Sequence, residues 1–170
     1  MNLVCFYVSA AIAVLATFLV VTRRNGVHAL LYLVVSFLAL AVIMFLLGAP
    51  FIAALETIVY AGAIMVLFVF VMMLLNLGPG SGQAGAWLDR KQWAGPAILA
   101  AILLGELLLM VSRVSRGPGP AAAIGPKEVG ISMFGPYLLA VELASLLLLA
   151  GLVSAYHLGR YDDEQPGRDS

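Results

Sequence analysis

The stretch Phe51–Leu75 reads FIAALETIVYAGAIMVLFVFVMMLL and carries a single carboxylate, Glu56. About 20 mostly apolar residues suffice to cross the roughly 30 Å hydrocarbon core of a bilayer, so this stretch predicts a transmembrane helix. An acid near the centre of such a helix costs about 2.5–3.5 kcal/mol on insertion scales. Because Tyr60 and the small run Ala61-Gly62-Ala63 follow Glu56, the sequence indicates a helix that handles protons or changes shape.

The whole chain has the composition of a membrane protein. Of its 170 residues, 63% are hydrophobic and 11% are charged, whereas soluble domains are about 45–50% apolar and about 25% charged. We expect an all-α integral membrane protein in which residues 1–159 form a single domain of five transmembrane helices, with a polar cytoplasmic tail at 160–170. The five predicted spans are 3–22, 27–47, 51–75, 95–112 and 134–157.

Charge and cysteine content exclude several classes of function. The formal net charge is zero, so no basic surface favours nucleic acid. Cys5 is the single cysteine, which leaves no internal disulfide and no Cys-x-x-Cys pair for zinc or an iron–sulfur cluster. We expect no metal or redox cofactor to be bound by this chain. The N-terminus lacks a basic segment and a cleavage site, so we expect its first helix to be retained.

The positions of lysine and arginine predict the orientation in the membrane. The loops and tail on one side carry six of these residues, and those on the other side carry three. The positive-inside rule therefore places the N-terminus outside, in the periplasm, and the C-terminus in the cytoplasm. The inner residues are Arg23, Arg24, Arg90, Lys91, Arg160 and Arg168, and the outer ones are Arg113, Arg116 and Lys127.

Prolines and glycines divide the chain between these spans. Pro50, Pro96 and Pro136 stand where the third, fourth and fifth predicted helices open, a position at which the missing N–H of proline costs nothing. The outer segment Arg116–Gly130 contains Gly-Pro-Gly-Pro and is expected to be an irregular connector. The Gly-, Pro- and Ser-rich loop 77–85 is expected to be flexible. Small residues along the helices favour close packing against partner subunits.

Glu56 and Tyr60 are the main candidate pair. They are four residues apart and so share one helical face, with Ala53 and Ala63 nearly on it. The functional interpretation is a protonatable carboxylate in a hydrated seam, with Tyr60 as its partner or relay. The structural alternative is a glutamate satisfied by a neighbouring helix. Gly62 has two interpretations as well, either close helix packing or a local π-type irregularity.

The remaining ionisable groups carry weaker predictions. Glu142 lies in the fifth span with Ser145 one turn later, and proton handling and a structural hydrogen bond are equally compatible with it. Glu106 lies among leucines, and no role is assigned to it. His28 is expected to be an interfacial or capping residue at the start of the second helix, and His157 a cation suited to a helix C-terminus.

Three runs resemble a known family. ALETIVYAGAIMVLFVFVMML at 54–74 resembles the third helix of the J chain of bacterial proton-pumping NADH:quinone oxidoreductase, the chain 6 of mitochondrial complex I. FGPYLLAVELAS at 134–145 and NGVHALLY at 25–32 resemble its fifth and second helices. The resemblance implies a multi-pass subunit of the bacterial inner (plasma) membrane that helps to couple quinone reduction to proton translocation and has no catalytic centre of its own. NADH, FMN, iron–sulfur clusters and quinone would belong to partner subunits.

The resemblance also implies site residues and partners. The family's third helix has a π-bulge near its tyrosine, which would fall between Tyr60 and Met65 here and include Gly62. Its conversion to regular helix is thought to gate a hydrated proton path. Glu56 and Glu142 match the family's acids in the third and fifth helices. The implied partners are other small membrane-arm subunits and the membrane subunit that forms the quinone site, within the lipid bilayer.

Three alternatives to this function stay open at the level of the sequence. The first is a freestanding proton or ion carrier that uses Glu56 and Glu142, although the first two spans are nearly devoid of ionisable groups. The second is a purely structural packing subunit whose glutamates fix the register between chains. The third is a similar small subunit of a related hydrogenase or antiporter complex.

Overall fold

The computed structural model describes residues 2–23, 25–74, 90–114 and 123–161, and the regular structure in these ranges is entirely helical. The chain forms two compact units, Met1–Gly125 and Pro126–Ser170, and each is described by itself. The predicted single five-helix domain therefore stays a prediction, and the loop 77–85 and the tail beyond Tyr161 lie outside the described residues. The elements are α1 (Asn2–Thr22), α2 (Gly26–Leu46), α3 (Pro50–Leu55), the π-helix η1 (Glu56–Ile64), α4 (Met65–Leu74), α5 (Arg90–Val114), α6 (Pro126–Met133) and α7 (Leu138–Tyr161).

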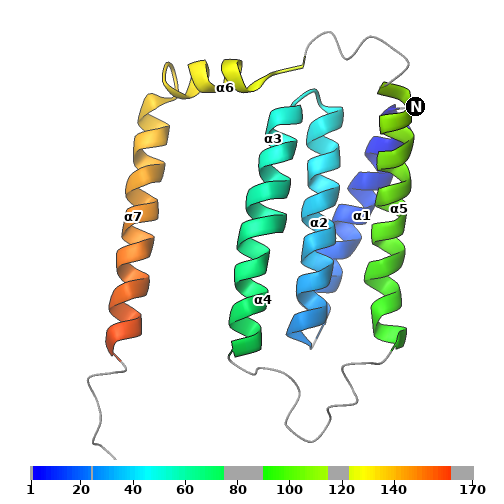
Figure 1. Cartoon of the computed structure of the whole chain (residues 1–170), viewed down its shortest axis with the longest axis horizontal. Helices are drawn as coiled ribbons and strands as arrows, with labels where there is room; N and C mark the ends of the chain where they lie inside the picture. The colour runs from blue at the N-terminus through cyan, green and yellow to red at the C-terminus, as the bar shows by residue number, and fades with distance from the viewer. Residues whose placement is uncertain (1, 24, 75–89, 115–122, 162–170) are drawn as a thin grey trace, which may run out of the picture. The chain divides into compact units, whose positions relative to one another are not determined.

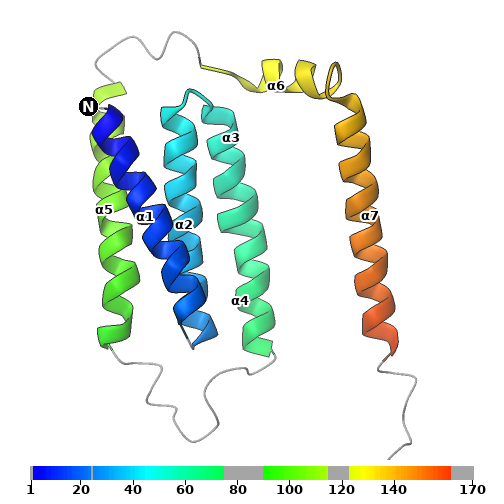
Figure 2. The ribbon, with the colours of Figure 1, turned by 180° about the vertical axis from the view of Figure 1, so that it is seen from behind.

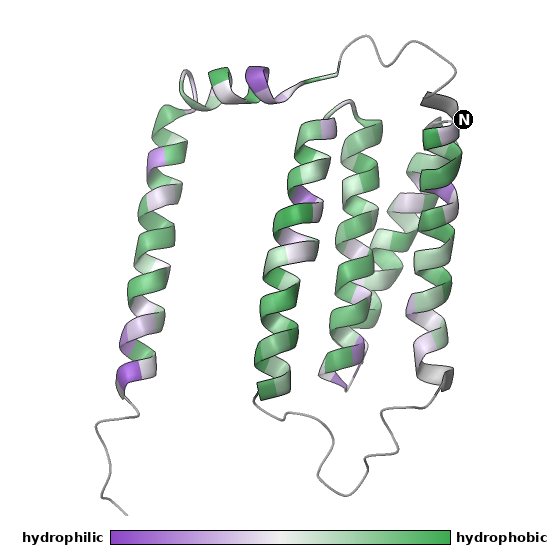
Figure 3. Cartoon of the chain, viewed as in Figure 1, coloured by the Kyte–Doolittle hydropathy of each residue, from purple (hydrophilic) through white to green (hydrophobic). Residues whose placement is uncertain are grey.

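The prediction of five spans is confirmed. The helices that are long and apolar enough to cross a membrane are Leu3–Thr22, Gly26–Leu46, Pro50–Leu74, Trp93–Ser112 and Leu138–Arg160. Each lies within a few residues of its predicted bounds. Figure 3 shows that the apolar colour along these helices is interrupted by short hydrophilic stretches, one of them in the upper half of the third span. The polar residues that could carry function are therefore few and local.

In the first unit, α2 is the central helix. It packs against α1, α3, η1, α4 and α5, and Figures 1 and 2 show it between the third span on one side and α1 and α5 on the other. The N-terminal ends of α1 and α3 and the C-terminal ends of α2 and α5 lie at the same end of the unit (Figure 1). Gly48 has φ of 85° in the turn from α2 to α3, a conformation that glycine adopts at little cost.

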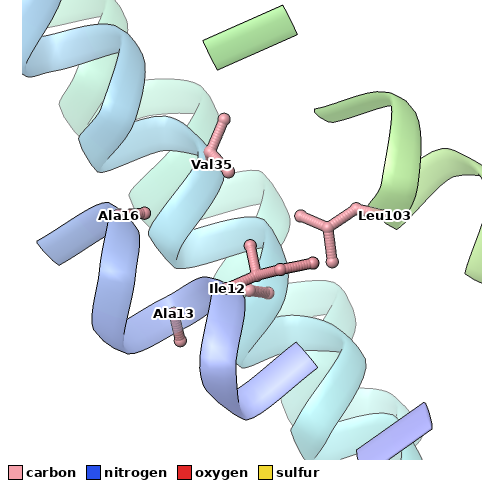
Figure 4. Packing of buried hydrophobic residues seen from close by; sticks show 6 residues of the cluster. Ile12, Ala13, Ala16, Val35 and Leu103 are labelled. Carbon is pink, nitrogen blue, oxygen red and sulfur yellow. The ribbon is translucent and has the colours of Figure 1, made fainter. Parts of the chain in front are cut away.

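Small residues bring α1, α2 and α5 together. Ala13 and Ala16 of α1, with Ala39 of α2, are buried in the same cluster as larger side chains from the three helices. Figure 4 shows Ile12 and Leu103 converging from α1 and α5 beside α2. Helices in lipid are held by close packing rather than by a hydrophobic drive, so alanines at these positions allow the approach. The cluster comprises Ile12, Ala13, Ala16, Val35, Ala39 and Leu103.

Three expectations about the helix ends and connectors were wrong. Pro96 does not open the fourth helix, because α5 begins at Arg90 and contains Pro96. Residues 126–130 are not an irregular connector, since α6 begins at Pro126. Pro136 does not open the fifth helix, because it lies within a turn and α7 begins two residues later, at Leu138. In this turn the Leu138 N–H donates to the Gly135 carbonyl oxygen at 3.3 Å.

The second unit contains the short α6 and the long α7. Every side chain of α7 from Glu142 to Arg160 is exposed. A helix that is apolar on all sides belongs in lipid or against other chains, so α7 has the surface of a span whose neighbours lie outside its own unit.

Candidate functional site

The third span is broken by a π-helical segment. Regular α-helix runs from Pro50 to Leu55, the π-helix η1 covers the nine residues Glu56–Ile64, and α-helix resumes at Met65. The Met65 N–H donates to the carbonyl oxygens of Tyr60 and Gly62, and the first of these lies five residues back, as in a π-helix. The π-type irregularity expected around Tyr60 to Met65 is therefore present in the structure, as a longer segment that begins at Glu56.

The side chains around η1 fit this geometry. The Thr57 hydroxyl donates to the Ala53 carbonyl oxygen at 3.0 Å, which satisfies a backbone acceptor at the α-to-π junction. A Cβ added to Gly62 would lie 3.4 Å from the Thr57 carbonyl oxygen, five residues earlier. A side chain at position 62 would therefore be in contact with the π-helical backbone itself.

Glu56 and Tyr60 both reach the outside of the first unit. Glu56 is half-buried, and Tyr60 is 45% exposed. Among the described contacts no hydrogen bond joins the two side chains, so the direct relay that their spacing predicted is not formed. Tyr60 instead places its ring beside Phe37 of α2, with centroids 5.5 Å apart. Met65, where α-helix resumes, is buried.

Glu142 belongs to the second unit. Its side chain is exposed on α7, and the Ser145 hydroxyl donates to the Glu142 backbone carbonyl oxygen at 2.7 Å rather than to its carboxylate. The five predicted site residues therefore divide into two groups. Glu56, Tyr60, Gly62 and Met65 lie along one continuous segment, and Glu142 lies on a different unit.

A second group of polar residues was not predicted as a site. The Ser9 hydroxyl of α1 donates to Glu106 Oε2 of α5 at 2.8 Å, and both side chains are buried. Further along α1, Thr17 lies 2.8 Å from the Ser36 hydroxyl of α2. The sequence signal was the i, i+4 spacing of Ser9, Ala13 and Thr17 on one face of α1, but it does not identify the partner helices.

The expectation that His28 caps α2 was wrong, whereas its position at the membrane interface stays a prediction. Asn25 caps α2 by accepting from the Val27 N–H at 3.0 Å. His28 is only 5% exposed, neither of its ring nitrogens has a hydrogen-bond partner among the described residues, and its ring meets Trp93 edge-on at 6.2 Å. Arg23 lies over the buried Tyr32 ring, 5.4 Å from its centroid. Within the described ranges no group of three metal-ligating side chains is present.

Comparison with known proteins places these features in a family. Residues 16–158 match the family described as NADH-ubiquinone/plastoquinone oxidoreductase chain 6. The chain is 59% identical to NADH-quinone oxidoreductase subunit J of Pseudomonas aeruginosa strain PAO1 over 162 residues, 94% of this chain and 98% of that protein. It is 56% identical to subunit J of Escherichia coli K12 over 156 residues, 91% and 85% of the two chains. Subunit J of Buchnera aphidicola from Schizaphis graminum is 47% identical over 156 residues, 91% and 96% of the two chains.

Proposed function

This chain belongs to the chain 6 family of NADH-ubiquinone/plastoquinone oxidoreductases, with the bacterial subunit J proteins, and we propose that its third span gates proton translocation. As a family member with five apolar spans, it is a multi-pass membrane subunit of NADH-quinone oxidoreductase, complex I. The observation that carries the proposal is the π-helix Glu56–Ile64 within the third span. Such segments are rare and occur frequently at functional sites.

The gate works by converting η1 to regular α-helix. Each residue of an α-helix turns by about 100°, so absorbing one extra residue rotates α4 against α3 by about that angle. This rotation changes the surroundings of three side chains. Tyr60 moves away from Phe37, and Met65 leaves its buried position. Met72 moves away from Gly26, to which the end of its side chain is so close that a Cβ added to the glycine would collide with the Cε atom of Met72. Phe37 and Gly26 both belong to α2, so the rotation changes the contacts of the third span with α2.

The rotation affects proton transfer because polar side chains lie on the π-helical segment. Glu56 lies about 9 Å from the start of α3, by the rise of a helix, and its half-buried carboxylate can take up or release a proton where water reaches it. An event elsewhere in the complex moves such an equilibrium only by favouring one state over the other. We assign that bias to quinone reduction in a neighbouring subunit, which couples electron transfer to proton movement through Glu56 and Tyr60. We assign proton handling to Glu142 as well, on its own unit.

The surroundings follow from the same proposal. The span α7 and the outward face of the third span are apolar and exposed, and we assign them to lipid, to other small membrane-arm subunits and to the membrane subunit of the quinone site. The excess of lysine and arginine on one side supports a periplasmic N-terminus and a cytoplasmic C-terminus in the bacterial inner membrane. The chain binds no cofactor of its own, and NADH, FMN, iron–sulfur clusters and quinone belong to partner subunits.

The substitution Gly62→Ala tests the gate. Alanine favours regular helix over glycine by about 1 kcal/mol, and in the π form its Cβ would lie 3.4 Å from the Thr57 carbonyl oxygen. The matched control is Gly105→Ala, whose Cβ meets nothing within 4 Å. In proteoliposomes containing the whole complex, we expect Gly62→Ala to assemble and to lower NADH-driven proton uptake, with Gly105→Ala unchanged. A packing subunit predicts instead that Gly62→Ala either loses assembly or pumps like the control.

A further inference from the structure

The buried carboxyl of Glu106 lies away from the third span. Its side chain is 8% exposed and accepts a hydrogen bond from the hydroxyl of Ser9, itself 0% exposed. By helix rise, Ser9 lies about 10 Å from the start of α1 and Glu106 about 12 Å from the end of α5, which places both inside the membrane span. The two residues belong to helices that pack on the opposite side of α2 from η1 (Figures 1 and 2).

Glu106 has no positive counter-ion in the part of the chain that the structure describes. On α1, the nearest titratable side chain on the face of Ser9 is Cys5, one turn away, and Tyr7 is exposed. On α2 the titratable groups are His28 and Tyr32, which lie near the other end of the helix. Burying a carboxylate without a counter-ion is costly, and intramembrane acids of this kind mark proton relays.

The chemistry of Ser9 suits a carboxyl that changes its protonation state. A serine hydroxyl has one donor and two acceptor lone pairs. It can donate to a carboxylate oxygen, as Ser9 does to Glu106 Oε2 at 2.8 Å, and after rotation of the hydroxyl it can accept from the O–H of a neutral carboxylic acid. One proton added to the carboxylate thus gives a neutral acid with the same partner and the same packing.

Further hydroxyl groups continue along the same face of α1. The Ala13 carbonyl oxygen, one turn beyond Ser9, accepts from Thr17 at 2.8 Å and from the buried Ser36 at 3.3 Å. Polar groups therefore follow the α1–α2–α5 interior from Glu106 to Thr17, over about 12 Å of α1 between Ser9 and Thr17.

We propose that Glu106 is a second proton-binding site of this chain, separate from the third span, with Ser9 as the partner of its carboxyl in both protonation states. Its ligand is a proton that enters along the hydroxyl groups of α1 and α2. Ser9 is a positioning residue, and Glu106 is the group that binds. The site does not depend on conversion of η1, so its test stands apart from the test of the gate.

Infrared difference spectra of the purified complex between acidic and alkaline buffer test this directly. We expect wild type to show a carboxylic acid C=O band that is lost in Glu106→Gln and displaced in Ser9→Ala, which keeps the carboxyl but removes its partner. The control Ser112→Ala, whose hydroxyl bonds its own helix at Leu109 O, leaves the band in place. Spectra of wild type and Glu106→Gln that superimpose would overturn the proposal and leave a fixed structural hydrogen bond.

A functional measurement separates the proton site from a helix clamp. Glu106→Gln keeps the shape and the hydrogen bond to Ser9 but cannot bind a proton, so we expect normal assembly with a loss in NADH-driven proton uptake across the pH range. Glu106→Asp should recover part of that loss. If Glu106→Gln pumps as wild type does while Glu106→Leu fails to assemble, the pair is a clamp and the proposal fails. Gly62→Ala is measured in its own experiment, so the result for Glu106 does not depend on the result for the gate.

Discussion

The ring of Tyr60 lies against the ring of Phe37, with centroids 5.5 Å apart and planes tilted by 53°. This contact ties the middle of the π-helix η1 to the central helix α2. Aromatic pairs of this geometry contribute about 0.5–1.5 kcal/mol beyond their buried area. The phenol hydroxyl adds a polar group at the same place. The ring and the hydroxyl of Tyr60 can therefore be tested separately.

Tyr60→Phe keeps the ring contact and removes the hydroxyl. We expect full assembly and intact electron transfer with reduced proton uptake, because the proposed proton path includes the hydroxyl of Tyr60. Phe37→Ala removes the ring contact and favours the α-helical form by about 0.5–1.5 kcal/mol. Proton uptake per quinone reduced, measured in proteoliposomes, shows separately what the loss of the hydroxyl and the loss of the ring contact do. Normal proton uptake in both variants would show that Tyr60 takes no part in the gate or in the proton path.

Gly95 and Gly26 should respond very differently to the same added methyl group. A Cβ at Gly95 would collide with the hydroxyl of Tyr32, which is buried and has nowhere to move. A Cβ at Gly26 would meet the terminal methyl group of Met72 and, at 3.8 Å, its sulfur, and this side chain is flexible. We expect Gly95→Ala to destabilise the chain by about 1–3 kcal/mol and Gly26→Ala to have little effect. The amount of assembled complex after graded heating of membranes measures both, and a milder loss for Gly95→Ala than for Gly26→Ala would contradict this packing.

His28→Leu should be tolerated. The histidine is buried, and within the described part of the chain both of its ring nitrogens are unpaired. Replacing unsatisfied polar groups by an apolar side chain of similar size is nearly neutral or stabilising. His28→Ala leaves a cavity instead and should be the less stable variant. Heat resistance of the assembled complex is the measurement. Loss of assembly in His28→Leu, with His28→Ala no worse, would mean that the imidazole has a partner within the complex.

Glu56→Gln tests the acid of the third span. Glutamine keeps the size of the side chain but cannot carry the proton, so we expect assembly to persist and proton uptake to fall. The matched control is Glu128→Gln on α6, an acid outside the spans. Loss of the assembled complex in Glu56→Gln, measured by native electrophoresis, would instead support a structural glutamate.

The sequence predicted the spans because their signal is strong and local. A bilayer requires about 20 apolar residues per helix, and the turn at Gly48 separates two such runs plainly. The third span was also identifiable, since an acid and a glycine in an apolar helix are conspicuous. Helix ends were less predictable: Pro96 lies inside α5 because residues from Arg90 onward extend the helix beyond its apolar part.

The pairing between helices could not be predicted. Ser9 and Glu106 are 97 residues apart in the chain, and no periodicity in either helix identifies the other as its neighbour. The burial of His28 has the same cause, because Trp93 reaches it from α5. Such contacts depend on which helices are adjacent and at what rotation, and a hydropathy pattern that is apolar on every side does not determine either.

The most direct test of the gate is a short reducible cross-link, made with a bis-methanethiosulfonate reagent, between Gly26→Cys and Met72→Cys. A Cβ at Gly26 reaches the end of the Met72 side chain while η1 is π-helical, so the two positions are neighbours in that state. The gate requires α4 to rotate by about 100° against α2 during turnover, and the cross-link restrains this rotation. Proton uptake per NADH is measured in proteoliposomes before and after reduction of the cross-link, with each single cysteine as control. We predict that uptake is lost in the cross-linked double variant and returns on reduction. Equal uptake in both states would contradict the gate.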